Sequence, residues 1–158
     1  MSDVISVLLV DDHALVRKGF RRMIEDDPGI AVIGEASNGM EAVQLAQQLR
    51  PRVIVMDMAM PGMDGVQATR EILRRLPETA IVILSMYAQE SYVRHAFDAG
   101  ALGYILKNAI DVDLAAAIRD VAAGKRVLDP GLIAAEREPD DVFGRLTQRE
   151  KQILQLIA

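Results

Sequence analysis

Residues 7–20 read VLLVDDHALVRKGF: a short continuous apolar run, two aspartates, and then the spacing of an amphipathic helix. Continuous runs of Val and Leu are typical of strands that are covered on both faces. After the aspartates, Val16, Phe20 and Ile24 recur every four residues and define one helical face. The segment therefore predicts a strand and a helix, with a pair of carboxylates at the turn between them.

The same unit recurs along the chain. Further apolar runs are each followed by helical spacing, and Pro28, Pro51 and Pro77 separate the early units. Five such units in a row predict an α/β fold with one open, doubly wound parallel sheet of five strands and helices on both faces. The predicted strands cover residues 5–10, 30–33, 53–56, 80–84 and 103–106.

Composition excludes several classes of protein. The 158 residues are 51% hydrophobic, which is enough for a packed core, and they include no cysteine, which excludes disulfide scaffolds, thiolate zinc sites and cysteine nucleophiles. No apolar run approaches the roughly 20 residues that span a bilayer, and the N-terminus lacks the features of a secretory signal. We therefore expect a cytoplasmic protein that does not bind membranes.

Charge and pattern divide the chain unevenly. Residues 124–158 carry six basic and six acidic side chains, so the whole net charge of −5 lies in residues 1–123. An acidic domain is a poor nucleic-acid binder but a reasonable place to hold a cation. We predict one domain over 1–123, a linker over 124–145, and a partial helix over 146–158, where Thr147 and Glu150 have capping-box spacing.

Polar side chains follow the predicted strands. Because ligands of an open parallel sheet bind outside the carboxyl ends of its strands, these residues should meet at one edge. Any one of them alone is most simply a cap, a turn residue or a surface lysine, but five together favour a site. They are Asp11, Asp12, Asp57, Ser85 and Lys107.

The chemistry of this set is that of phosphoryl transfer. Three carboxylates in one cleft repel each other, and oxygen ligands without Cys favour Mg²⁺ as the ion that resolves the repulsion. A carboxylate is a competent nucleophile toward phosphorus, and Lys107 supplies a second positive charge for the phosphoryl oxygens. We therefore predict transfer of a phosphoryl group to one Asp in the presence of Mg²⁺.

Four motifs together closely resemble a bacterial two-component response-regulator receiver domain, which implies a flavodoxin-like, CheY-like fold over about residues 4–123. The segment DDHALVRKGF and the tail LTQREKQILQLIA resemble the NarL/FixJ subfamily, whose output domain is a LuxR-type helix-turn-helix. The four motifs are VLLVDDHALVRKGF (7–20), VIVMDMAMPGMDGVQA (53–68), AIVILSMY (80–87) and GALGYILK (100–107).

The resemblance implies a role for each matching residue. Asp57 matches the phospho-acceptor, while Asp11, Asp12 and the main-chain carbonyl of Ala59 match the Mg²⁺ ligands, with Asp12 favoured over Asp11 as a direct ligand. Lys107 matches the lysine that binds phosphate. The remaining matches are the switch hydroxyl Ser85, the switch aromatic Tyr104, and the loop residues Pro61 and Gly65, with proline fixing φ and glycine permitting the turn.

The resemblance also implies partners. A histidine kinase would donate the phosphoryl group, and the phosphorylated protein would form a homodimer. DNA binding would belong to the rest of the LuxR-type domain, because the tail supplies only its first helix. We expect the apolar side chains of that helix to be covered by the receiver or by a neighbouring chain, or the tail to be mobile; they are Ile153, Leu154 and Ile157.

Two departures from the family pattern stand beside the acceptor. Ala59 occupies the position where Asn is common, which removes a side-chain amide that could orient a hydrolytic water, so an altered autodephosphorylation rate is expected. Tyr87, two positions after Ser85, is a bulky residue that could shield the site.

Three other functions remain open at this stage. An aspartyl-phosphate phosphohydrolase would usually have a second Asp where Ala59 stands. A flavodoxin-like nucleotide binder would need a glycine-rich loop where residues 11–15 read DDHAL. A stand-alone receiver that acts by protein contact only is compatible with a tail that supplies a single helix.

Several residues outside the site have simpler interpretations. Asp64, before Gly65, is expected in a turn, and His13 is expected to be a polar residue at the start of the first helix. Gly19 inside that helix suggests close packing. A run of basic residues on the same helix is typical of a solvated face; it comprises Arg17, Lys18, Arg21 and Arg22.

Overall fold

A parallel β-sheet forms the centre of the molecule. The computed structural model describes residues 4–108, 113–129 and 132. The sheet has the strand order β2-β1-β3-β4-β5-β6, and every neighbouring pair is parallel. The doubly wound parallel fold is confirmed, with one more strand than predicted. The strands are β1 (Ile5–Val10), β2 (Ile30–Ala36), β3 (Val53–Asp57), β4 (Ala80–Ser85), β5 (Gly103–Leu106) and β6 (Val127–Leu128).

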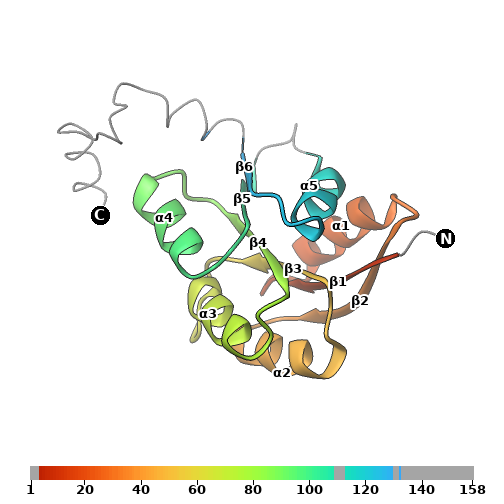
Figure 1. Cartoon of the computed structure of the whole chain (residues 1–158), viewed down its shortest axis with the longest axis horizontal. Coiled ribbons are helices and arrows are strands. Elements are labelled where there is room, and N and C mark those ends of the chain that lie inside the picture. The colour runs from red at the N-terminus through yellow and green to blue at the C-terminus, as the bar shows by residue number, and fades with distance from the viewer. Residues whose placement is uncertain (1–3, 109–112, 130–131, 133–158) are drawn as a thin grey trace.

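Helices cover both faces of the sheet. Of the five helices in the described ranges, two lie on one face of the sheet and three on the other, an arrangement that can be followed in Figure 1. Every residue of β3 and β4 is buried, because these central strands are covered on both sides, which explains their continuous apolar sequences. No helix within the described ranges is long and apolar enough to cross a membrane. The first pair is α1 (Ala14–Glu25) and α5 (Leu114–Ala122); the other three are α2 (Gly39–Leu49), α3 (Gly65–Arg75) and α4 (Glu90–Asp98).

Local sequence signals set where helices begin. Asn38 caps α2 by accepting a hydrogen bond from the Glu41 main-chain N–H. Asp64, expected in a turn, is the N-cap of α3 and forms a reciprocal capping box with Gln67. These caps fix the starts of the two helices that follow β2 and β3.

The extra strand lies within the segment 124–145 that was predicted as a linker. The Val127 N–H donates to the Leu102 carbonyl at 2.8 Å, so β6 pairs with the outer side of β5. Asp129 follows β6 and is buried, with its N–H bonded to the Tyr104 carbonyl and its carboxylate accepting from the Leu106 N–H. The predicted helix over 146–158 lies outside the described residues.

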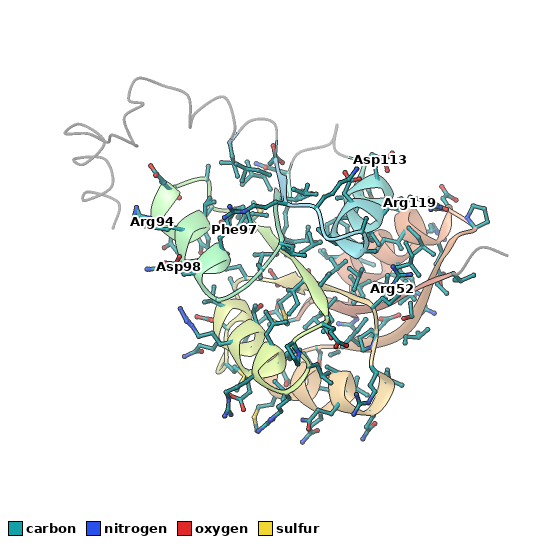
Figure 2. All side chains as sticks on the ribbon, in the orientation of Figure 1. Arg52, Arg94, Phe97, Asp98, Asp113 and Arg119 are labelled. Atoms are coloured by element: carbon teal, nitrogen blue, oxygen red, sulfur yellow. The ribbon has the colours of Figure 1, made fainter. Side chains whose placement is uncertain are left out.

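An ion pair joins α5 to the turn between α1 and β2. Arg119 projects from α5 toward this turn (Figure 2), and its Nε lies 2.9 Å from Asp27 Oδ2. The contact lies far from the carboxyl ends of the strands, at an exposed position. Arg119 and Asp27 therefore form an arginine–carboxylate pair that is remote from the carboxyl edge of the sheet.

Two helical glycines have opposite surroundings. A Cβ on Gly65, the first residue of α3, would lie 2.3 Å from the Asp57 carbonyl oxygen. Gly65 is therefore required for close approach, and the expectation that it permits a turn is wrong: the positive φ of this loop is at Gly62, with 79°. A Cβ on Gly19 would have no neighbouring atom within 4 Å, so the close packing expected at Gly19 is not found.

We predict opposite effects of alanine at these two glycines. Gly65→Ala should lower the free energy of unfolding by about 1–3 kcal/mol, because the new methyl group displaces the main chain at Asp57. Gly19→Ala, the matched control, should raise it by about 0.5–1 kcal/mol through helix propensity. Urea denaturation of both variants measures the two changes. Equal effects would contradict the close-approach explanation.

Candidate functional site

Two carboxylates and an ammonium group meet at the carboxyl ends of the strands. Asp11 follows β1, Asp57 ends β3, and Lys107 follows β5. Lys107 Nζ lies 3.0 Å from Asp11 Oδ2 and 3.2 Å from Asp57 Oδ1. Asp11 and Asp57 are only 1% and 3% exposed. The chain leaves β1 toward β2 on one side and later returns to β3 on the other, which is where ligands bind in open parallel sheets.

Burial disfavours ionisation of the Asp57 carboxyl group. The pKa of its carboxyl is raised from 3.8 to about 6, mainly by the loss of hydration and then by the negative charge of Asp11. The Lys107 charge opposes both effects, while a side-chain hydrogen bond with Asp12 adds to them. The Asp57 carboxylate is therefore poorly neutralised by the protein alone.

The Lys107 ammonium group responds in the opposite way. Burial lowers its pKa, but hydrogen bonding to Asp11 and the charges of Asp57 and Asp11 outweigh burial, so the pKa is raised overall. Lys107 therefore stays protonated throughout the physiological range. It supplies one positive charge to a site in which several carboxylates compete for it.

The acidic pair has oxygens suited to a cation. Asp11 Oδ2 and Asp12 Oδ1 are buried and accept no well-oriented hydrogen bond within the described part of the chain. Their near neighbours are Lys107, beside Asp11, and His13, whose Nδ1 lies 3.1 Å from Asp12 Oδ1. Ligand atoms of Asp11, Asp12 and His13 lie within 4.8 Å of one another. Buried carboxylate oxygens that accept no well-oriented hydrogen bond fit a hard divalent cation.

Ser85 and Tyr104 form a buried hydroxyl pair beside this site. The Tyr104 ring is fully buried, and its hydroxyl lies 2.7 Å from the Tyr87 carbonyl oxygen and 2.9 Å from Ser85 Oγ. A carbonyl only accepts, so when Tyr104 donates to Tyr87 its oxygen is left to accept from Ser85. Burial raises the pKa of Tyr104 to about 12, although the bond to Ser85 opposes this.

A model of the response regulator receiver domain matches residues 7–119. The chain is 38% identical to the response regulator GacA of Pseudomonas aeruginosa, across 98% of this chain and 76% of GacA. It is 41% identical to the transcriptional regulatory protein LiaR of Bacillus subtilis, across 98% of this chain and 77% of LiaR.

The chain belongs to the response regulator receiver family.

Solved structures agree with this assignment. A LuxR-family two-component response regulator from Aurantimonas sp. SI85-9A1 is 39% identical, with a TM-score of 0.81 over 85% of this chain and 99% of that one. A structure of two RcsB dimers bound to two parallel DNAs is 25% identical, with a TM-score of 0.76 over 84% of this chain and 67% of that one. The resemblance to LuxR-type regulators of the NarL/FixJ class is confirmed.

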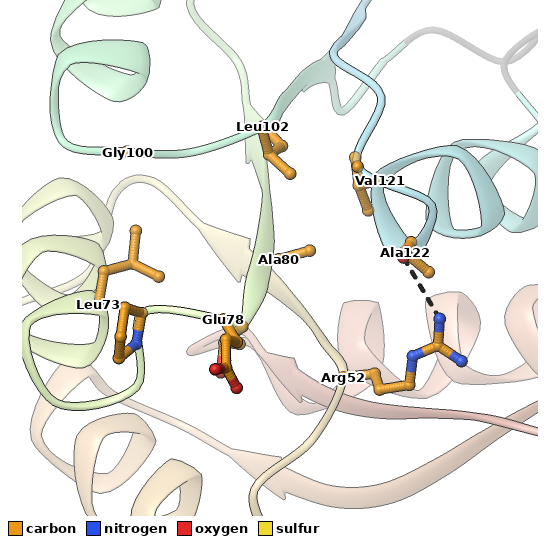
Figure 3. A pocket seen from close by; sticks show the side chains of 11 residues that line it. Arg52, Leu73, Glu78, Ala80, Gly100, Leu102, Val121 and Ala122 are labelled. Atoms are coloured by element: carbon orange, nitrogen blue, oxygen red, sulfur yellow. Dashed lines mark hydrogen bonds between the residues drawn. The ribbon is translucent and has the colours of Figure 1, made fainter.

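The receiver has an open, partly aromatic hollow lined by Met58, which directly follows Asp57. Tyr87 and Tyr92 stack with ring centroids 4.5 Å apart and line one side of it. Ala59 and Pro61, predicted near the acceptor, line it too, and both are exposed. The volume is about 420 Å³, and the remaining lining residues are Met60 and Asp64. A second hollow, of about 280 Å³, lies near the amino ends of β4 and β5 beside Arg52 and Glu78, and none of the predicted site residues lines it (Figure 3).

Sequence reasoning missed two contributors to the receiver's edge. Asp129 joins the carboxyl end of the sheet, and the signal was the apolar pair Val127–Leu128 ending in Asp, as in the predicted strands. The sequence places Arg17 on a solvated helix face, but in the structure its side chain is only 17% exposed and pairs with Glu35. Spacing along one helix could not reveal a partner on β2.

The raised pKa of Asp57 predicts a pH-dependent stability. A carboxyl whose folded pKa exceeds its unfolded value stabilises the fold below pH 4, and this contribution is lost as the pH rises through about 6. In metal-free buffer, Asp57→Asn should therefore raise the free energy of unfolding above pH 6 by roughly 2–3 kcal/mol, with no gain below pH 4.

Asp27→Asn is the control, for which the opposite pH dependence of the free energy of unfolding is expected. Its hydrogen bond from Arg119 lowers the pKa of Asp27, so the stabilisation exists at neutral pH and disappears in acid. Urea denaturation of both variants and the wild type from pH 3.5 to 8 measures the two profiles. Parallel profiles for the two variants would contradict the assignment.

Proposed function

We propose that this receiver accepts a phosphoryl group on Asp57 from a histidine kinase in a Mg²⁺-dependent reaction. The observation that carries the proposal is the position of Lys107 Nζ, 3.0 Å from Asp11 and 3.2 Å from Asp57. This leaves one buried, poorly neutralised carboxylate beside an acidic pair in which Asp11 Oδ2 and Asp12 Oδ1 accept no well-oriented hydrogen bond within the described residues. The arrangement favours a phospho-accepting switch over a nucleotide binder.

The reaction would use side chains that are already in place. An Asp57 carboxylate oxygen attacks phosphorus as the bond from phosphorus to the kinase histidine nitrogen breaks, and that nitrogen keeps the electron pair. Lys107 would pair with a phosphoryl oxygen in place of its present contact with Asp57. Mg²⁺, held by Asp11, Asp12, Asp57 and the Ala59 carbonyl, would neutralise charge on the carboxylates and the phosphoryl oxygens.

The switch would begin at Ser85. Its hydroxyl is buried and bonded to Tyr104 and to the Tyr87 N–H, so a new bond to a phosphoryl oxygen would compete with the present ones. Breaking the bond between Ser85 and Tyr104 would free the switch aromatic to change its packing between α4 and β5. Phosphorylation would in this way bias an equilibrium between two states.

The output would be control of transcription. GacA and LiaR are named as regulators, and RcsB dimers have been solved on DNA. We propose that phosphorylation promotes a homodimer, and that DNA binding belongs to a LuxR-type domain rather than to this acidic receiver.

Mass spectrometry of the intact protein tests the phospho-acceptor directly. Incubation with a small phosphodonor and Mg²⁺ should add one phosphoryl group to the wild type and to Asp27→Asn, and none to Asp57→Asn. EDTA should prevent the addition. An unmodified wild type, even with its cognate kinase, would contradict the proposal, and so would phosphorylation of Asp57→Asn.

The side chain at position 59 should affect the lifetime of the phosphorylated form. Ala59 is exposed next to the acceptor and carries no group that could orient water. Ala59→Asn supplies an amide there, so its rate of phosphate loss should differ from that of the wild type. Loss of the added mass over time measures both rates, and equal rates would contradict a role for this position.

A further inference from the structure

We propose that Arg17, held by Glu35, positions the acidic pair of the receiver for its cation. The inference rests on the proposed function, because it concerns the cation that Asp11 and Asp12 would hold. The contacts that the structure gives for Arg17 and Glu35 are with the Asp11 carbonyl, with each other and with Arg21, so both would act through the main chain of the turn after β1.

The Arg17 guanidinium joins the turn to the end of β2. Its Nη1 donates to the Asp11 carbonyl oxygen at 2.5 Å, and its Nε donates to Glu35 Oε1 at 2.7 Å. The planar guanidinium makes both bonds at once in a fixed geometry, which a lysine ammonium on a flexible chain does not reproduce. The carbonyl of Asp11 is therefore tied to β2 through one rigid group.

Glu35 is itself held from two sides. Its second carboxylate oxygen, Oε2, accepts from Arg21 Nη1, so two arginines from successive turns of α1 share one carboxylate. Hydrogen bonds from Arg17 and Arg21 lower the pKa of Glu35, so it is ionised at neutral pH. The Glu35 side chain is 29% exposed, which leaves the network partly shielded from solvent.

The network completes the bonding of Asp11. The Asp11 N–H donates to the Ala36 carbonyl, next to Glu35, and Asp11 Oδ1 accepts from the His13 N–H. With Arg17 on its carbonyl, both main-chain polar groups and one carboxylate oxygen of Asp11 are engaged. This directs Asp11 Oδ2, the oxygen with no well-oriented hydrogen bond, toward the site.

A purely electrostatic role and a positioning role of Arg17 predict opposite changes in Mg²⁺ affinity when its side chain is removed. Arg17 is a cation next to the cation site, so its charge alone weakens Mg²⁺ binding, and removing it would tighten binding. If Arg17 acts by holding the turn, removing it weakens binding instead. Losing such a supporting contact typically lowers metal affinity by roughly 10-fold or more.

Calorimetric titration of the metal-free chain with Mg²⁺ measures the affinities. Arg17→Gln and Arg17→Lys should each raise the Mg²⁺ dissociation constant by roughly 10-fold, because neither side chain makes both bonds. Arg119→Gln, which removes an arginine–carboxylate pair remote from the site, should leave it unchanged. Tighter binding by Arg17→Gln, or wild-type affinity in Arg17→Lys, would overturn the proposal.

Amide hydrogen exchange in EDTA provides a second measurement that needs no metal. Exchange of residues 11–16 should become faster in Arg17→Gln and Glu35→Gln, and not in Arg119→Gln. Failure of the wild type to bind Mg²⁺ would overturn the proposed function, while the exchange data would still decide whether Arg17 orders the turn. Unchanged exchange at residues 11–16 in both network variants would overturn the positioning role.

Discussion

Lys107 Nζ shares one buried site with the carboxylates of Asp11 and Asp57 at the ends of three parallel strands. One ammonium group cannot neutralise the acidic groups gathered there, and the cost of leaving a buried carboxylate unbalanced is visible in the raised pKa of Asp57. The surrounding architecture brings these charges together and keeps them there. The site is therefore electrostatically prepared for added positive charge and for an anion that pairs with Lys107.

The fold supports this arrangement from several directions. Strand β3 and the first three residues of β5 are buried, which fixes the positions of the residues at their carboxyl ends. Gly65 allows α3 to begin against the main chain of Asp57. On the other side, Arg17 and Glu35 fix the turn that carries the acidic pair. An arginine–glutamate pair and a glycine, both outside the charged cluster, thus help to fix the positions of its oxygens.

The repeated strand–helix pattern could be predicted from the sequence. Side-chain contacts between elements that are distant in the sequence could not. Alternating strand and helix patterns predicted the sheet and placed Asp57 and Lys107 at one edge, because parallel strands bring their carboxyl ends together. The bond from Arg17 to β2 depends on contacts between elements, which spacing does not encode. Gly65 was assigned the right importance for the wrong reason, since only the structure shows which atom a side chain there would meet. The short strand β6 lacked the length that makes an apolar run recognisable.

The short strand β6 also changes what the receiver can do at its border. An unpaired edge strand offers a row of main-chain donors and acceptors to other chains, and β5 would be such an edge without β6. Here the Tyr104 carbonyl and the Leu106 N–H are both satisfied by Asp129. Two receivers therefore cannot merge their sheets through β5. An association on this side would meet the two-residue strand β6 and the side chains of the neighbouring helices instead of the main chain of β5.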